Sequence, residues 1–452
     1  MKIIIVGDGK VGQILTARLT EEGHDVIVID RNLQTLQTLQ LSYDVMTING
    51  NGASLQILKN ADAANAGLLI AATAEDEVNL LCCVMAKKLG CAHTIARVRN
   101  PEYAKQLTFF RNELGLSMII NPEAAAAYEI YHLLQLPSFL ARDSFAKGRV
   151  EIVEIKMEKG CTIIGKRLSE LYKEAKVKVL VCAVERGDQV YIPDGSFCIQ
   201  EGDNIHVTAE THRLAALLKY MGIPIPKIHD VLLVGGGKIG YHLANRLIAA
   251  GMNVKIIEKD YDRCTTLSEQ LPKALIINDD GSQKQLLDEE TRGRMDAVVS
   301  LLNIDEINLF ICMYMRQHGA RKVIAKVDRT EYMSVYENFG VDSVISPKDL
   351  VCNNVVRYVR DIDNNTGDSI LALHQLLGGR AEAIEFLAGK GTRHLEEPLT
   401  KVPIRKGVLV ACIIRNGTIL FPSGDDCIRL FDSVIIVTTS EKRINELNDI
   451  FV

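Results

Sequence analysis

The chain has 452 residues, enough for two to four domains, and its 47% hydrophobic and 24% charged residues are typical of a globular protein. A formal net charge of −5 gives no basic surface of the kind that nucleic-acid binding needs, and the eleven cysteines lack metal-binding spacing. No apolar run approaches the ~20 residues that span a bilayer, and no signal pattern precedes the first apolar strand, so we expect a cytoplasmic protein.

The first part of the chain predicts a parallel α/β domain. Short runs rich in β-branched residues alternate with segments whose apolar residues recur every three or four positions, as expected for strands and amphipathic helices. Pro122 opens a further helical stretch that reaches about Leu136 and is stopped by Pro137. The predicted strands are 2–7, 25–30, 44–48, 66–73, 93–98 and 118–121.

A second kind of segment follows, with short strands and glycine turns typical of a small α+β lobe. Its predicted strands are 151–157, 178–184, 189–192 and 204–208, and residues 222–226, with two prolines, form the expected linker to the rest of the chain.

The whole arrangement then repeats. The sequence from Gly7 to Gly12 (GDGKVG) recurs 228 positions later from Gly235 to Gly240 (GGGKIG), and Asp30 has its counterpart in Glu258. We therefore predict an α/β fold with two tandem Rossmann-like parallel-sheet lobes, each followed by a small α+β lobe. The expected domains are 1–137, 138–221, 228–367 and 372–452.

The glycine motif predicts a nucleotide site. It leaves an apolar strand, opens a helix, and is followed by an acid that closes the next strand. Gly7 permits the tight turn, Gly9 lets the backbone approach a pyrophosphate, and Gly12 lets the helix pack on the sheet. The N–H groups of the helix N-terminus suit the phosphates. Asp30 can accept hydrogen bonds from the adenosine ribose hydroxyls and disfavours a 2′-phosphate, which favours NAD or an unmodified adenine nucleotide over NADP.

Other candidates lie at the carboxyl ends of later strands. Thr73 and Ala74 follow the fourth strand, where ligands of open α/β sheets bind. Arg97, near the end of the fifth strand, can bind a phosphate, and a structural ion pair is the alternative. Asp76 and Glu77 begin a helix, and we expect a capping role for them.

A dehydrogenase would need a general acid or base beside the nicotinamide. The two small lobes, of about 70 residues each, differ where shared chemistry should match, since His206 aligns with Ile435. We therefore expect a protein that is not an enzyme. The alternative functions are an NAD-dependent oxidoreductase and a nucleotide sensor of a transporter other than the potassium uptake system considered below.

These motifs also resemble a known family. The glycine motif, the strand-end acid, the pattern T-x-x-D-E-x-N from Thr73 to Asn79, the run from Ala96 to Tyr103 and the small lobe are similar to the RCK or KTN domain. Two such units in one chain resemble the TrkA family, the regulatory subunits of bacterial Trk potassium uptake systems. The resemblance implies binding of NAD(H) and ATP/ADP and gating of a membrane potassium channel subunit of the TrkH type. It also implies a homo-oligomer, a tetramer forming a ring of eight RCK units, on the inner face of the cell membrane.

The resemblance also implies nucleotide contacts in both units. The second unit differs from the first because Leu302 and Asn303 replace Thr73 and Ala74, and Lys326 replaces Arg97, so we expect a different nucleotide preference there. The candidate binding residues are Gly7, Asp8, Gly9, Lys10, Val11, Gly12, Asp30, Thr73, Ala74, Arg97, Gly235, Gly236, Gly237, Lys238, Ile239, Gly240 and Glu258.

Overall fold

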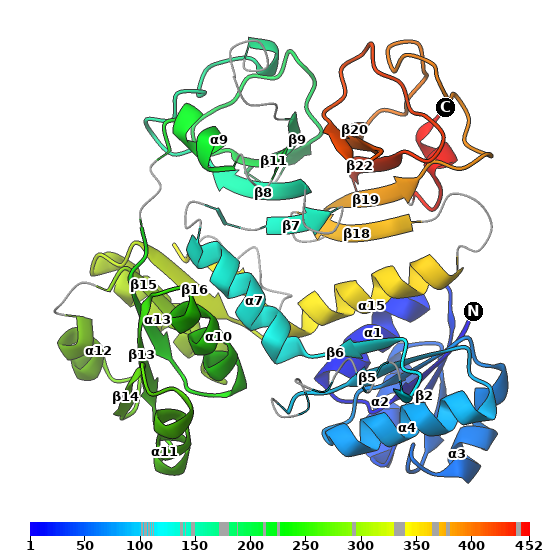
Figure 1. Ribbon diagram of the computed structural model, residues 1–452, viewed down its shortest axis with the longest axis vertical. Helices are drawn as coiled ribbons and strands as arrows, with labels where there is room; N and C mark the ends of the chain where they lie inside the picture. Colours follow the sequence, from blue (N-terminus) through cyan, green and yellow to red (C-terminus); the bar gives the residue numbers. More distant parts are fainter. Residues whose placement is uncertain are drawn as a thin grey trace. The chain divides into compact units, whose positions relative to one another are not determined.

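The structure is a computed structural model of the full chain (Figure 1). It describes residues 1–100, 103, 106, 109, 111, 113–135, 139–140, 142–145, 150–170, 180–187, 189–210, 214–223, 227–291, 295–329, 340–363, 370–376, 380–439 and 444–452.

The first lobe is a parallel sheet of six strands in the order β3-β2-β1-β4-β5-β6. The strand order reverses between β1 and β4, which is the arrangement of a dinucleotide-binding fold. Buried β-branched runs form the central strands. The elements are β1 (Lys2–Val6), α1 (Lys10–Glu21), β2 (Asp25–Asp30), α2 (Leu33–Ser42), β3 (Met46–Asn49), α3 (Leu55–Asn60), η1 (Ala63–Asn65), β4 (Leu68–Ala71), α4 (Asp76–Leu89), β5 (His93–Arg97), β6 (Met118–Ile120) and α7 (Pro122–Gln135).

The second Rossmann lobe repeats this topology, with the strand order β14-β13-β12-β15-β16-β17. Its elements are β12 (Asp230–Val234), α10 (Lys238–Ala249), β13 (Asn253–Glu258), α11 (Tyr261–Gln270), β14 (Leu275–Asn278), α12 (Lys284–Thr291), β15 (Ala297–Ser300), α13 (Asp305–Gln317), β16 (Lys322–Lys326), β17 (Ser343–Ile345) and α15 (Pro347–Asp363).

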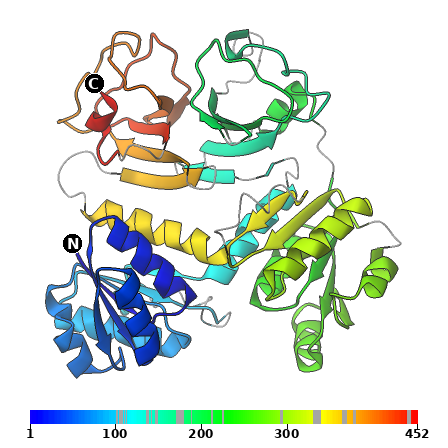
Figure 2. The ribbon, with the colours of Figure 1, turned by 180° about the vertical axis from the view of Figure 1, so that it is seen from behind.

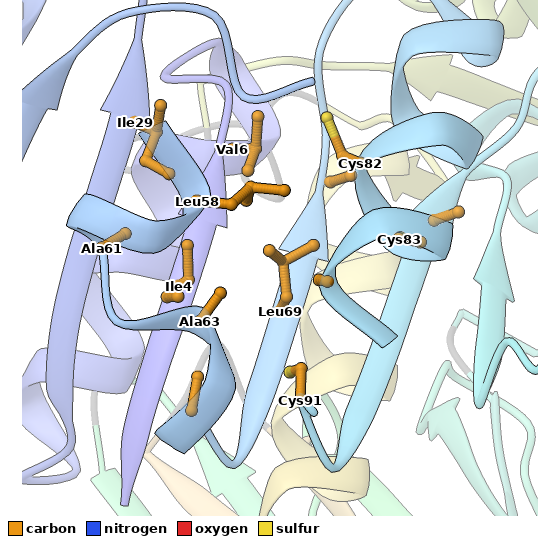
Figure 3. Close-up of a cluster of buried hydrophobic side chains, with 14 of the residues drawn as sticks. Ile4, Val6, Ile29, Leu58, Ala61, Ala63, Leu69, Cys82, Cys83 and Cys91 are labelled. Carbon is orange, nitrogen blue, oxygen red and sulfur yellow. The ribbon is translucent and has the colours of Figure 1, made fainter. Parts of the chain in front are cut away.

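The core of the first lobe explains how the glycine loop is held. Side chains of α3 and α4 pack on one face of the sheet (Figure 3), where the labelled residues are Ile4, Val6, Ile29, Leu58, Ala61, Ala63, Leu69, Cys82, Cys83 and Cys91. Alternation along β1 turns Ile5 to the opposite face, where α1 approaches so closely that a Cβ on Gly12 would lie 3.8 Å from Ile5. Strand β1 is thus buried on both faces, by α3 and α4 on one side and by α1 on the other.

The small lobes are antiparallel sheets of matching topology, ordered β10-β9-β11-β8-β7 and β18-β19-β22-β20-β21. Buried residues of both sheets, among them Val150, Cys182, Ala383 and Ile435, share one hydrophobic cluster. The elements are β7 (Arg142–Phe145), β8 (Val150–Lys156), β9 (Leu180–Arg186), β10 (Gln189–Tyr191), β11 (Asn204–Glu210), α9 (Leu214–Tyr220), β18 (Ile370–Leu376), β19 (Ala381–Leu387), β20 (Val408–Arg415), β21 (Thr418–Leu420), β22 (Ser433–Thr439) and η6 (Leu447–Ile450).

The chain forms two compact units whose boundaries fall inside α7 and α15. One unit comprises Met1–Ala126 with Ser346–Val359, and the other comprises Ala127–Ile345 with Arg360–Val452. Helix α15 follows the second Rossmann sheet in the chain, yet its residues 347–359 pack in the unit of the first sheet. Figure 2 shows α15 alongside α1.

Particular contacts fix both helices. In the first unit, Arg18 of α1 pairs with Asp349 at 3.3 Å, and the Tyr358 hydroxyl lies 2.8 Å from Nδ1 of His93. In the second unit, the Arg246 guanidinium lies 5.1 Å from the ring centre of Tyr128 on α7. Within this chain, α7 therefore contacts the second repeat.

The predicted fold class is confirmed by the two parallel sheets and the antiparallel sheets that follow them. Strand β7 was missed, because its sequence, RDSF, has no apolar alternation. The predicted helix stop at Pro137 and the linker prolines at 224 and 226 lie outside the described residues. The four domain boundaries stay a prediction. Among the residues that the structure describes, no helix is both long and apolar enough to cross a membrane.

Candidate nucleotide sites

The first glycine loop lies where the sheet order reverses. It joins the carboxyl end of β1 to α1, and the segment with Thr73 and Ala74 follows the adjacent strand β4. In open α/β sheets this crevice, at the carboxyl ends of the strands, is where ligands bind. The fold thus brings the glycine loop and the Thr73 segment together.

Each glycine of the loop meets a different constraint. Gly7 has φ +101°, and a Cβ on it would lie 2.9 Å from the main-chain nitrogen of Thr73. A Cβ on Gly12 would lie 2.0 Å from the Gly7 oxygen, so no larger residue fits there. Gly9 is different, because a Cβ on it would meet nothing within 4 Å. The space over Gly9 is therefore open, and the contact with a pyrophosphate stays a prediction.

The start of α1 completes a cradle suited to an anion. Gly9 is the N-cap and offers no side chain to the N–H groups of the first turn, and no acidic residue stands in that turn. Lys10 is exposed and Val11 is buried. Uncapped N–H groups and the positive end of the helix dipole favour a phosphate here.

Asp30 ends β2 beside the loop. Its Oδ2 accepts a hydrogen bond from the main-chain nitrogen of Asp8 at 2.7 Å, and its Oδ1 accepts one from Asn32 at 2.7 Å. The carboxylate is therefore held in place by the two segments that border the crevice. Each oxygen keeps a lone pair with which it can accept a ribose hydroxyl.

Asn79, which we named as part of the sequence pattern but not as a candidate site residue, fixes the segment after β4. It is fully buried, and its Oδ1 accepts hydrogen bonds from the nitrogen and the hydroxyl of Thr73 at 2.8 and 2.7 Å. Its Nδ2 donates to the Arg97 oxygen at 2.9 Å, so one side chain ties the ends of β4 and β5 together. The signal was present in the pattern T-x-x-D-E-x-N, where a polar residue stands on the buried side of a helix.

Arg97 stands in an ion pair. Its Nη2 lies 3.6 Å from Oε1 of Glu123, the second residue of α7, and Arg99 lies 3.9 Å from the same oxygen. Burial lowers the pKa of Arg97 from its ordinary value, while Glu123 acts in the opposite direction. Of the two roles considered for Arg97, the structure thus shows the ion pair. A role in phosphate binding stays a prediction.

Asp76 and Glu77 stand in the first turn of α4, where negative charge suits the helix dipole, but the capping role that we expected was wrong: the N-terminus of α4 has no side-chain cap, and Asp76 binds another segment. Its Oδ2 accepts hydrogen bonds from the main-chain nitrogens of Arg99 and Asn100 at 2.8 and 2.7 Å, and Glu77 accepts one from the Tyr103 hydroxyl at 2.6 Å. These acids hold the segment after β5 to the start of α4.

The second site repeats the main-chain geometry. Gly235 has φ +110°, a Cβ on Gly240 would lie 2.4 Å from the Gly235 oxygen, and Gly237 is open, with Lys238 exposed and Ile239 buried after it. Glu258 Oε2 accepts a hydrogen bond from the Gly236 nitrogen at 2.8 Å, as Asp30 does from Asp8.

The side chains around the second loop differ from those around the first. Arg263, absent from our candidates, donates from Nε to the Gly236 oxygen at 2.9 Å. Lys326 donates to the Leu302 oxygen at 3.2 Å and lies 3.9 Å from Asp328. The sequence signal for Arg263 was only its position five residues after the strand-end acid.

Comparisons with known proteins agree with this architecture. The TrkA-N domain model matches residues 3–122 and 231–347, and the TrkA-C domain model matches 152–222. The chain is 33% identical over 449 residues to the Trk system potassium uptake protein TrkA homolog 2 of Methanosarcina mazei, covering 97% of this chain and 98% of that protein. It is 30% identical to the Trk system potassium uptake protein TrkA of Haemophilus influenzae, covering 100% and 98%.

Solved structures share the fold. The GsuK channel bound to NAD has a TM-score of 0.63 at 18% identity and covers 97% of this chain and 77% of that one. The GsuK RCK domain has a TM-score of 0.63 at 19% identity and covers 97% and 92%. Since the domain models match more than half of the chain and the relatives match along their full length, the chain belongs to the TrkA family of Trk-system potassium uptake proteins.

Proposed function

We propose that this chain is the regulatory nucleotide sensor of a potassium uptake system, and that it binds NAD(H) and ATP or ADP in its two Rossmann lobes. The observation that carries this proposal is the duplicated loop geometry. In both lobes an open glycine stands at an uncapped helix N-terminus, and a strand-end acid holds the preceding nitrogen at 2.7 or 2.8 Å. That combination suits a pyrophosphate and an adenosine ribose.

The proposed contacts follow from this arrangement. The loop glycines and the first residues of α1 and α10 receive the phosphates, the strand-end acids receive the ribose, and Thr73, Ala74 and Arg97 border the crevice in the first lobe. GsuK, which shares the fold, has been solved bound to NAD and bound to ADP. We propose the same ligand class for this chain.

We further propose that the protein acts by binding and not by chemistry. It would stand on the cytoplasmic face of the membrane as a homo-oligomeric ring, a tetramer with eight nucleotide-binding lobes, and gate a membrane potassium channel subunit of the TrkH type. The names of the full-length relatives support the potassium uptake system. A nucleotide shifts such a ring between states only if it binds them with different affinities.

A route from site to ring begins at Glu123. This residue stands at the start of α7 and faces Arg97, which borders the crevice. A phosphate near Arg97 would compete with Glu123 for the guanidinium. We propose that this competition weakens the ion pair between Arg97 of the first Rossmann lobe and Glu123 of α7. Helix α7 continues into the second compact unit.

Calorimetric titration of the full chain with NADH, NAD, ATP and ADP tests the ligand class. Asp30→Ala and Glu258→Ala should each weaken one set of sites by more than about tenfold, since each removes a charged acceptor of the ribose. Asp25→Ala is the matched control, because Asp25 is an exposed acid at the opposite end of the same strand. Absence of binding of all four nucleotides to the unaltered protein would refute the proposal.

Two further arms test regulation. NADH absorbance should stay constant during binding, and a steady decline with a candidate substrate would favour the oxidoreductase alternative. Potassium flux through liposomes that carry a Trk-type membrane subunit should change when the protein and a nucleotide are added together. Flux that depends on the protein and ignores all nucleotides would contradict the sensor role.

A further inference from the structure

The first glycine loop contains a buried carboxylate for which the described part of the chain supplies no hydrogen-bond partner. The Asp8 side chain is only 4% exposed, and neither of its carboxylate oxygens has a hydrogen-bond partner among the described residues. Buried polar groups are normally paired, and an unpaired one in a native structure calls for an explanation. The position of Asp8, between two loop glycines that border the proposed phosphate site, makes that explanation a matter of ligand binding.

The surroundings of Asp8 disfavour its negative charge. Burial and, to a smaller extent, the neighbouring Asp30 carboxylate raise the pKa of Asp8 to about 6, while the Gln13 side chain acts in the opposite direction. From α1, the nearby polar side chain is Gln13, whose amide donates to the main-chain oxygen of Asp8 at 3.2 Å. From β2, the group is Asp30, which is already held by the Asp8 nitrogen. Two carboxylates thus share one end of the crevice.

The second loop lacks this feature. Gly236 occupies the equivalent position, and a Cβ there would lie 2.5 Å from Leu267 and 3.2 Å from Oε2 of Glu258. A guanidinium, from Arg263, donates to the Gly236 oxygen instead. Both loops are followed by an exposed lysine, Lys10 or Lys238. Beyond that shared lysine, the first loop has two acids, and the second has one acid and the Arg263 guanidinium.

We propose that Asp8 makes nucleotide binding in the first Rossmann lobe proton-linked: this lobe binds its nucleotide together with a proton, and the second lobe does not. The inference rests on the proposed nucleotide sites. The phosphates of a bound nucleotide place further negative charge beside Asp8 and remove water from it, and both effects favour the protonated acid. The proton comes from the solvent and forms an O–H bond on one carboxylate oxygen, which then becomes a donor.

The consequence is a site that discriminates between ligands by charge. A lobe that must neutralise an acid before binding prefers nucleotides with less charge near the loop and binds them more tightly as the pH falls. One linked proton changes the affinity by at most about tenfold per pH unit. We expect about threefold per unit between about pH 6 and 8, because Asp8 is partly protonated before binding.

The test counts protons. The full-length protein is titrated with NADH near pH 7 in two buffers whose ionisation enthalpies differ, and the difference in observed heat gives the protons taken up per nucleotide. The unaltered protein should take up a substantial fraction of a proton in the first lobe. Asp8→Asn should take up none there and should bind NADH with an affinity that no longer depends on pH.

Matched variants separate this effect from damage to the fold. Asp44→Asn makes the same change of charge at an exposed residue near the amino end of β3, away from the loop, and should behave as the unaltered protein. Asp8→Gly reproduces the loop of the second lobe and serves if Asp8→Asn does not fold. Binding of NADH without proton uptake by the unaltered protein overturns the inference and leaves the proposed function standing. Failure to bind any nucleotide overturns the proposed function itself.

Discussion

The two Rossmann lobes have the same main-chain architecture around the glycine loop and different charges. In both, a buried asparagine bridges two strand ends, Asn79 in the first lobe and Asn308 in the second. In both, a strand-end acid accepts a hydrogen bond from the loop nitrogen. At equivalent positions of the repeat, however, the first lobe has Asp8 where the second has Gly236, and Arg97 where the second has Lys326.

This difference separates the contacts that determine the main-chain geometry of the site from those that determine its charge. Hydrogen bonds to the main chain survive the duplication, because losing one leaves a buried group unpaired. Side chains that border the open crevice changed, since water or a ligand can replace their contacts. The following predictions test that division, from the contacts that build the loop to those that adjust it.

The largest effect should come from Gly12→Ala. Its new Cβ would lie 2.0 Å from the Gly7 oxygen, so α1 must move away from the loop. We expect a loss of more than about 4 kcal/mol of unfolding free energy in the first lobe, measured by denaturant titration. Gly9→Ala is the control, because its Cβ meets nothing within 4 Å: the fold should keep its stability and lose nucleotide binding. A stable Gly12→Ala that still binds NADH would contradict the close packing.

Asn79→Ala should cost about 3 kcal/mol, because it leaves the Thr73 nitrogen and the Arg97 oxygen unpaired in a buried position. Asn308→Ala should cost about as much in the second lobe, where Asn308 makes the equivalent bonds to Leu302 and Lys326. Denaturant titration measures both. Unequal losses would show that only one lobe depends on its asparagine.

Asp8→Asn should stabilise the protein at alkaline pH. The pKa of Asp8 in the folded state, about 6, lies above the ordinary value of 3.8, so its contribution to stability is full below about pH 4 and is lost as the pH rises through about 6. The variant escapes that loss and should gain about 2 kcal/mol at about pH 8 and nothing near pH 4. Urea midpoints at both pH values measure this difference. An equal gain at both would point to packing instead of charge.

The smallest effect should come from Arg97→Lys, which gives the first lobe the cation of the second. A lysine cannot offer a two-pronged contact to a phosphate, so ATP affinity in the first lobe should fall about fivefold, or ~1 kcal/mol. Lys326→Arg should have the opposite effect in the second lobe. Calorimetric titration with ATP and NAD measures both. A change in the NAD affinity equal to that for ATP would place Arg97 away from the terminal phosphates.

Much of this architecture could be predicted from local patterns. The runs around Ile3 to Val6 and Val26 to Ile29 are buried on both faces. Such strands can be predicted from a sequence because every position is apolar. The loop glycines and Asp30 were legible for a related reason, since each type of residue meets a steric or hydrogen-bonding demand of its own position.

What the sequence did not reveal depends on partners distant along the chain. The pairing of Arg97 with Glu123 and the burial of Asp8 arise only when separate strands and helices meet. Asn79 looked like one polar residue on an amphipathic helix, and its bonds to two strand ends became visible only with the sheet in place.

The placement of α15 has a consequence for how the two copies could ever be separated. Residues 346–359 complete the first compact unit, where Cys352 approaches the Val11 oxygen at 4.0 Å and Asp349 pairs with Arg18. A fragment that carries only the first copy would lack this helix and would expose the flank of α1 that the helix covers. A cut between the two sequence repeats therefore does not coincide with a boundary between the folded units.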